Sequence, residues 1–172
     1  MPTARESSAP MAGPATEAAR GRASRVSTRR LQLRLTALLT QWAGARGEVR
    51  SDWPFYNVPR ADRPSRLVPE VAYASFARLP LCLGELRDHL AIAPDIAVEF
   101  VSAADSPVVL QQKVAVYFGA GGLAVIAVDP LARTIAVYDG PAASRTFVMG
   151  DCARARGFAD LRLDVAALFG DA

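Results

Sequence analysis

Apolar residues follow a helical repeat early in the chain and shorter, strand-like patterns after it. Five large apolar residues fall at positions i, i+4, i+7, i+8 and i+11 of one segment: Leu31, Leu35, Leu38, Leu39 and Trp42. This spacing places them on one face of an amphipathic helix. Ser27 or Thr28 can cap its start, and the glycines between positions 44 and 47 mark its end.

The segment before this helix has a different character. Residues 1–26 show no periodicity, contain several prolines and glycines, and have few large apolar residues. Such a composition is typical of disorder. We therefore expect a disordered basic tail over residues 1–26 and a single domain over residues 27–172.

The middle of the chain predicts a strand, a helix and a second strand. Residues 95–102 (DIAVEFVS) alternate as a strand does, and residues 123–128 (LAVIAV) form a continuous apolar run. Between them, a helix is expected to begin at Ser106 and Pro107, with proline at its first position, and to stop at Gly119. This order is typical of a crossover unit that joins two parallel strands.

Shorter strand patterns lie on either side of this unit. They are residues 48–58, where Pro54 indicates an edge or a bend, residues around 68–72, residues 134–139 and residues 144–149. Residues 81–90 are expected to form a short helix or turn, and residues 163–169 a closing helix. The predicted fold class is a mixed α/β (α+β) sheet with flanking helices.

Composition excludes several kinds of site and a membrane-spanning segment. With 172 residues, 51% of them hydrophobic, the chain suffices for one domain with a real core. Cys82 and Cys152 match no zinc or redox spacing, which indicates a reducing compartment and a cytoplasmic location. The single histidine, His89, excludes most zinc sites and the histidine-containing triads unless His89 itself serves. No apolar run reaches the roughly 18 residues of a membrane span.

Charge is concentrated at the start of the chain. Of the net charge of +3, residues 1–30 contribute six arginines and two glutamates, so the remainder is about −1. This near-neutral body gives only weak support for nucleic-acid binding through bulk charge.

Lys113 is the one lysine of the chain, beside 19 arginines. Arginine stays charged in proteins, whereas a lysine ammonium is a compact charge whose pKa can shift. Because every other basic side chain except that of His89 is an arginine, Lys113 is a candidate for a position that needs an amine rather than a guanidinium. Codon bias and a surface position are the alternative.

Glu99 is a carboxylate in the middle of an apolar strand, where burial is costly unless it is paired or binds metal. Asp95 shares its strand face but lies about 13 Å away, too far for the two to share one metal ion. Asp95 is therefore interpreted as a strand-start or turn residue. The partner is expected from a neighbouring strand, where Glu70 is the obvious candidate. A solvated face, or pairing of Glu99 with an arginine, stays open.

Three segments resemble the Uma-two family of restriction endonuclease-like proteins, within the PD-(D/E)xK nuclease superfamily. They are PEVAYASFARL (69–79), APDIAVEFVS (93–102) and QQKVAVYFGAGGLAVIAVDPLARTIAVY (111–138). The similarity covers roughly residues 25–170 and is most specific over 93–138.

The resemblance implies a function and a site. It implies a metal-dependent endonuclease acting on DNA, with Mg²⁺ or Mn²⁺ held by Glu70 and Glu99. It implies that Lys113 takes the role of the lysine that simpler superfamily members carry two residues after the Glu, where this chain has Val101. Because superfamily nucleases commonly cut two strands with two sites, it also implies a homodimer.

Three departures favour a second hypothesis. Glu70 stands where the family has aspartate, residues 102–110 (SAADSPVVL) lack the charges usual before the helix, and no match to the family's first hairpin, whose Glu joins the site, is found. The alternative is a catalytically degenerate member of the same fold that acts as a DNA-binding or protein-interaction module.

Overall fold

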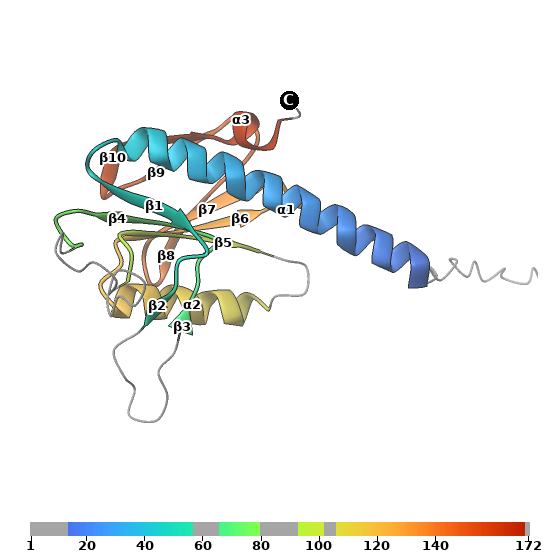
Figure 1. Cartoon of the computed structure of the whole chain (residues 1–172), viewed down its shortest axis with the longest axis horizontal. Helices are drawn as coiled ribbons and strands as arrows, with labels where there is room; N and C mark the ends of the chain where they lie inside the picture. Colours follow the sequence, from blue (N-terminus) through green and yellow to red (C-terminus); the bar gives the residue numbers. More distant parts are fainter. Residues whose placement is uncertain (1–13, 57–65, 80–92, 102–105, 171–172) are drawn as a thin grey trace, which may run out of the picture.

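The computed structural model describes residues 14–56, 66–79, 93–101 and 106–170, with side chains from residue 28 onward. Its centre is a six-stranded mixed sheet in the order β1-β4-β5-β6-β7-β8, which confirms the predicted fold class (Figure 1). These strands are β1 (Gly47–Ser51), β4 (Val71–Ser75), β5 (Ile96–Phe100), β6 (Ala124–Asp129), β7 (Thr134–Gly140) and β8 (Ala143–Phe147).

The predicted crossover unit is confirmed. β5 and β6 pair in parallel, and helix α2 (Pro107–Gly119) connects them. Ser106 caps α2 by accepting a hydrogen bond from the backbone of Val108, and Pro107 occupies the first turn. All other pairs in the sheet are antiparallel.

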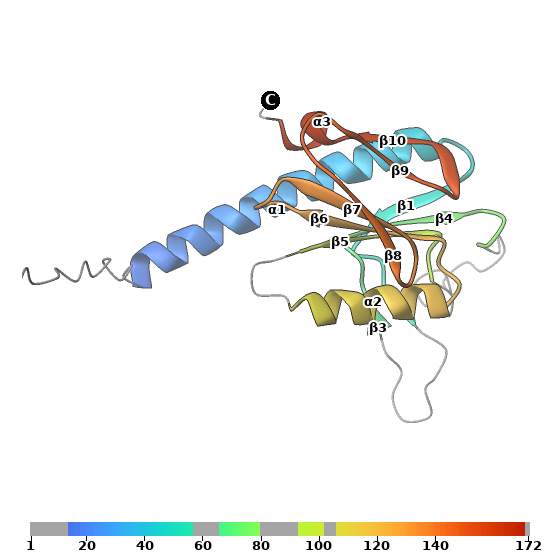
Figure 2. The same cartoon turned by 180° about the vertical axis from the view of Figure 1, so that it is seen from behind.

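Two layers cover the sheet. Helix α1 (Pro14–Ala43) lies on one face and α2 on the other (Figures 1 and 2). The larger core, on the α1 side, contains the predicted helix face at Leu31, Leu35 and Leu39. A smaller cluster on the α2 side contains Val114 and Tyr117. β5 is therefore buried on both faces.

Two predictions about the ends of the chain need correction. Helix α1 begins at Pro14 rather than near Ser27, so residues 14–26 are helical. At the other end, β9 (Cys152–Ala155) and β10 (Phe158–Asp164) form an antiparallel hairpin that was not predicted. With α3 (Val165–Phe169), the hairpin packs into the α1-side core.

Two smaller points complete the comparison with the predictions. The expected strand over 48–58 is divided into β1 and β2 (Phe55–Tyr56), and β2 pairs with β3 (Arg66–Leu67). The short helix or turn expected over 81–90 lies outside the described residues. No helix among the described residues is long and apolar enough to cross a membrane.

Candidate active site

Glu99 is a buried carboxylate at the end of a central strand. Its side chain is only 2% exposed. Strand alternation sends Ile96, Val98 and Phe100 into the α1-side core, while Ala97 belongs to the cluster beneath α2. Glu99 therefore faces α2, and its charge must be compensated there.

Glu70 lies immediately before β4, next to Glu99. The β4–β5 register pairs Val71 with Val98, and one further residue in each direction brings Glu70 opposite Glu99. An oxygen of the Glu70 carboxylate accepts a hydrogen bond from the backbone N–H of Phe100 at 3.1 Å. The two acids are thus brought together by strand pairing across 29 residues of sequence.

The two carboxylates influence each other. The pKa of Glu70 is raised from 4.5 to about 7, first by burial and then by the negative charge of Glu99, while backbone hydrogen bonds and Lys113 act in the opposite direction. Two carboxylates that are held close together repel each other, and a bound cation relieves that repulsion.

Helix α2 supplies both partners of Glu99. The Nζ atom of Lys113 lies 2.5 Å from Oε2, and the Tyr117 hydroxyl donates to Oε1 at 2.7 Å. Lys113 and Tyr117 are four residues apart, so they project from one helix face. Burial, followed by the charge of Glu99, raises the pKa of Tyr117, which keeps its hydroxyl protonated as a donor.

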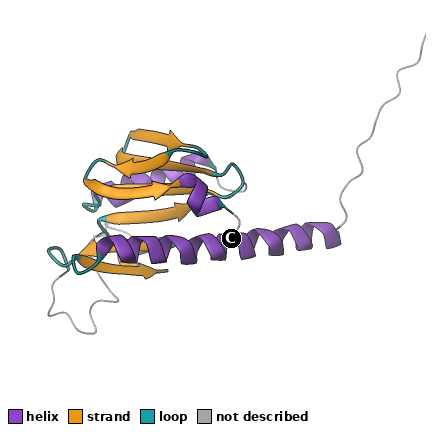
Figure 3. Ribbon diagram, turned by 90° about the horizontal axis from the view of Figure 1, so that it is seen from above, coloured by secondary structure: helices purple, strands orange, loops and turns teal. Residues whose placement is uncertain are grey.

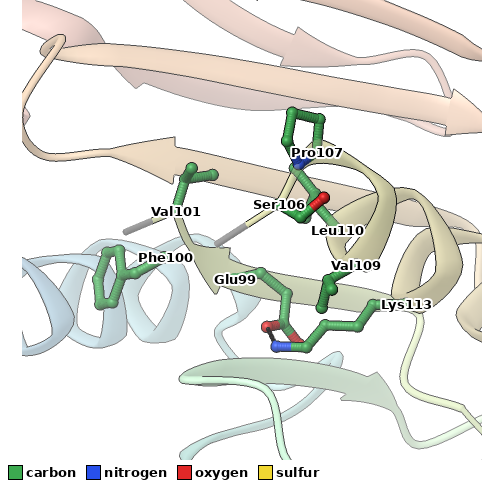
Figure 4. A pocket seen from close by; sticks show the side chains of 8 residues that line it. All are labelled: Glu99, Phe100, Val101, Ser106, Pro107, Val109, Leu110 and Lys113. Carbon is green, nitrogen blue, oxygen red and sulfur yellow. Dashed lines mark hydrogen bonds and ion pairs between the residues drawn. The ribbon is translucent and has the colours of Figure 1, made fainter. Parts of the chain in front are cut away.

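A pocket of about 140 Å³ opens beside this pair (Figure 4). Glu99 and Lys113 lie at one end and point toward each other, and the Ser106 side chain lies above them. The remaining lining residues are mainly apolar: Phe100, Val101, Pro107, Val109 and Leu110. Lys113 is 41% exposed as a side chain, so the ammonium can be reached from solvent.

The neighbouring acids are engaged elsewhere. Asp95 accepts from the Ser75 N–H at 2.6 Å and pairs with Arg78 at 3.0 Å, which confirms that it is a strand-start residue. Asp52 lies opposite Glu70 in the continued β1–β4 register, but its carboxylate accepts from Gln32 of α1 at 3.1 Å. It does not point into the site.

A further acid lies on the edge strand β1. β1 follows α1 and carries Glu48, although no sequence match to the family's hairpin was found. Glu48 pairs with Arg50 at 2.6 Å. It lies four residues along β1 from the Glu70 row, about 13 Å away, so it is not part of the site.

The donor set suits a hard divalent cation. Within the part of the chain that the structure describes, no three His, Cys, Asp or Glu side chains form a group that could hold a metal. Mg²⁺, however, is commonly held by one or two carboxylates together with water and substrate phosphate oxygens. Glu70 and Glu99 meet that requirement, and they exclude a closed structural zinc site, which needs four protein ligands.

The structure brings the three candidate residues of the sequence together. Glu70 precedes β4, Glu99 lies in β5 and Lys113 in α2. Glu99, Lys113 and Val101 line the pocket, and Glu70 approaches Glu99 from the neighbouring strand. Two contributors were missed. Tyr117 could have been found from its i+4 spacing to Lys113. Gln32, whose amide donates to the Glu70 carbonyl at 2.8 Å, gives no such signal.

Comparison with known proteins identifies the family and the fold. The model of the Uma2 family, described as "Putative restriction endonuclease", matches residues 16–166. Among solved structures, the chain is similar to a "putative nuclease belonging to DUF820" from Anabaena variabilis. The TM-score is 0.71 at 19% identity, over 83% of this chain and 80% of that one. No curated protein matches the chain.

Proposed function

Because the chain belongs to the Uma2 family of restriction endonuclease-like proteins, we propose that it is a metal-dependent endonuclease acting on DNA in the cytoplasm. The observation that carries the proposal is the contact between Lys113 and Glu99, with Glu70 on the adjacent strand. We propose that these three residues correspond to the lysine and two acids of the PD-(D/E)xK pattern, with the lysine on a helix.

The metal would be held by Glu70 and Glu99, with Mg²⁺ or Mn²⁺ as the expected ion. The chemistry that it supplies when bound is charge compensation at the scissile phosphate and a lowered pKa of a coordinated water. The reaction is hydrolysis: water adds to phosphorus, the P–O bond to the leaving sugar oxygen breaks, and that oxygen takes up a proton.

The protein side chains then have distinct roles. Lys113 would orient the attacking water, because its ammonium reaches the edge of the pocket as a compact donor. Tyr117 would hold Glu99 in one orientation through Oε1. Glu99 and Glu70 would hold the cation. These are electrostatic and positioning contributions, which dominate phosphoryl transfer.

Plasmid cleavage tests this proposal. Supercoiled plasmid is incubated with Mg²⁺ or Mn²⁺ and with wild type, Lys113→Ala or Glu99→Gln. We expect nicking by wild type and a loss of at least about 100-fold in both variants. Gln112→Ala is the matched control, because Gln112 is the exposed neighbour of Lys113 on α2. Undiminished cleavage by Lys113→Ala would remove the lysine from the mechanism.

A non-catalytic binding module is the second candidate function. The observation that favours it is that the described residues provide only two carboxylates at the site. It predicts no saturable Mg²⁺ binding. A rise in melting temperature with Mg²⁺ that Glu99→Gln abolishes would exclude it in favour of a metal site.

A homodimer is expected for an enzyme that cuts both strands of a duplex. Sedimentation velocity with and without duplex DNA, in EDTA, measures this directly. A monomer that nicks one strand at a time would contradict it.

A further inference from the structure

We propose that the N-terminal half of α1, residues 14–30, is an arm that binds the phosphate backbone of nucleic acid beside the active site. The inference deepens the proposed function by assigning the surface that holds the substrate. Its ligand class is a polyanionic nucleic-acid backbone.

The arm extends away from the folded body. α1 continues past the end of the sheet on the side where β5 ends and α2 begins, and Figures 1 and 2 agree on this direction. Figure 3 shows the same extension from above. At 1.5 Å per residue, residues 14–30 span about 24 Å, which corresponds to roughly seven base pairs of duplex.

The base of the arm touches the site. Arg29 donates to the Gln32 side chain at 3.2 Å, and Gln32 donates to the carbonyl of Glu70 at 2.8 Å. The carboxylate of Glu70 in turn bonds to the Phe100 N–H at 3.1 Å, next to Glu99. A phosphate backbone that follows the arm inward therefore approaches the start of β4, next to a proposed metal ligand.

The charge of the arm is opposite to that of a phosphate backbone and unlike that of the body. Residues 14–30 contain five arginines and one glutamate, a net charge of +4, whereas residues 31–172 sum to −1. The five arginines are Arg20, Arg22, Arg25, Arg29 and Arg30. The net positive charge available to a phosphate backbone is therefore concentrated in this part of the sequence.

Several arginines of the body already have protein partners. Arg34, the next one along α1, donates to the carbonyls of Leu168 and Gly170 at 2.9 and 2.5 Å. Arg78 is held by Asp95 at 3.0 Å. Arg29 donates to Gln32 as well, but its side chain is 67% exposed and lies 4.0 Å from Asp52, a distance at which the ion pair contributes little.

The physics of an isolated helix points the same way. A helical segment that extends past the end of the sheet (Figures 1 and 2) is marginally stable in water, and like charges along it weaken it further. A polyanion neutralises those charges and orders the segment. A second copy of the chain is the competing occupant, and the experiment below separates the two.

The test is the salt dependence of duplex binding in EDTA, so that no cleavage occurs. Fluorescence anisotropy with a labelled duplex gives Kd between about 50 and 200 mM NaCl. The arm variant is Arg20→Gln, Arg22→Gln, Arg25→Gln, since glutamine keeps helix propensity. We expect its slope of log Kd against log salt to fall by about two to three, and Kd to weaken at least about tenfold.

Two further variants complete the design. The matched control replaces Arg154, Arg156 and Arg162, exposed residues of the β9–β10 hairpin, with glutamine and so removes the same charge. It should bind as wild type does. Lysine at positions 20, 22 and 25 should restore binding, because the contact requires charge.

The outcomes separate the hypotheses. An unchanged slope in the arm variant, equal losses in arm and control variants, or failure of the lysines to restore binding would overturn the arm. The proposal would also fail if the arm variant without DNA sedimented differently from wild type while its DNA binding was unchanged. Residues 14–30 would then bind a second copy of the chain. Wild type that binds DNA but never cleaves it would refute the proposed endonuclease activity and leave the proposed DNA-binding arm unaffected.

Discussion

Replacing Tyr117 with phenylalanine tests whether the buried tyrosine holds Glu99 in place. The change removes one hydroxyl and leaves the ring in its apolar cluster. That hydroxyl donates to Oε1 of a side chain that is 2% exposed. A hydrogen bond to a charged group contributes about 1.5–3 kcal/mol, and here no water replaces it easily.

We therefore expect Tyr117→Phe to lower the free energy of unfolding by about 2 kcal/mol. In a domain of this size, that corresponds to a fall in melting temperature of about 4–8 °C. Urea denaturation followed by circular dichroism measures it. Tyr138→Phe is the matched control, because Tyr138 packs against the same cluster with no described bond to Glu99. It should cost less than about 0.5 kcal/mol.

A double-mutant cycle with Glu99→Gln gives a readout that simple packing would not change. A neutral amide accepts a weaker hydrogen bond than a carboxylate, so the cost of Tyr117→Phe should fall by about 1 kcal/mol in that background. Distant, independent sites add within about 0.3–0.5 kcal/mol. A coupling no larger than that would refute the argument that Tyr117 acts through Glu99.

Three further predictions concern the surroundings of the site. The pKa of Glu70 is raised from 4.5 to about 7 in the folded state. Between these values the folded state binds more protons than the unfolded state, so stability falls as pH rises. The melting temperature should therefore fall less between pH 5 and 8 for Glu70→Gln than for wild type. Gln32→Ala removes two hydrogen bonds near Glu70 and should weaken Mg²⁺ binding measured by calorimetry, besides costing about 1–3 kcal/mol in denaturant melts. Arg34→Ala should destabilise by about 1.5–3 kcal/mol in the same melts, whereas Arg30→Ala, exposed on the same helix, should affect DNA binding alone.

Local signals account for the elements that were predicted correctly. Helix α2 was predicted from Ser106, Pro107 and the terminal glycine, whose effects are confined to neighbouring residues of the chain. β5 and β6 read as strands because both are long, apolar and buried on both faces. These features do not depend on what lies elsewhere in the sequence.

The missed elements depend on distant partners or on weak local patterns. The β9–β10 hairpin contains only two buried residues in each strand, Ala153 and Ala155 in β9 and Leu161 and Leu163 in β10. The start of α1 was missed because alanine and arginine favour a helix through propensity rather than periodicity. Glu70 was named beforehand only as a candidate partner of Glu99, because the β4–β5 register that sets them opposite each other joins residues far apart in the sequence.

The resemblance implies a lysine two residues after the Glu on the strand, whereas the proposed site of this chain has its lysine on helix α2. In a strand, the residue two positions after Glu99 lies on the same face, and that residue is Val101. Val101 and Lys113 line one pocket, from β5 and α2 respectively, with Glu99 between them (Figure 4). An ammonium should therefore be able to reach the carboxylate from either element.

Moving the lysine back to the strand tests this equivalence. Lys113→Ala should lose at least about 100-fold in cleavage rate, and adding Val101→Lys should recover at least about tenfold of it. Val109→Lys is the control, because it adds the same charge to the same pocket from a different position on α2. Equal recovery by both would mean that any nearby cation suffices. No recovery by Val101→Lys, in a protein that still melts as wild type does, would show that the helix supplies an orientation that the strand cannot.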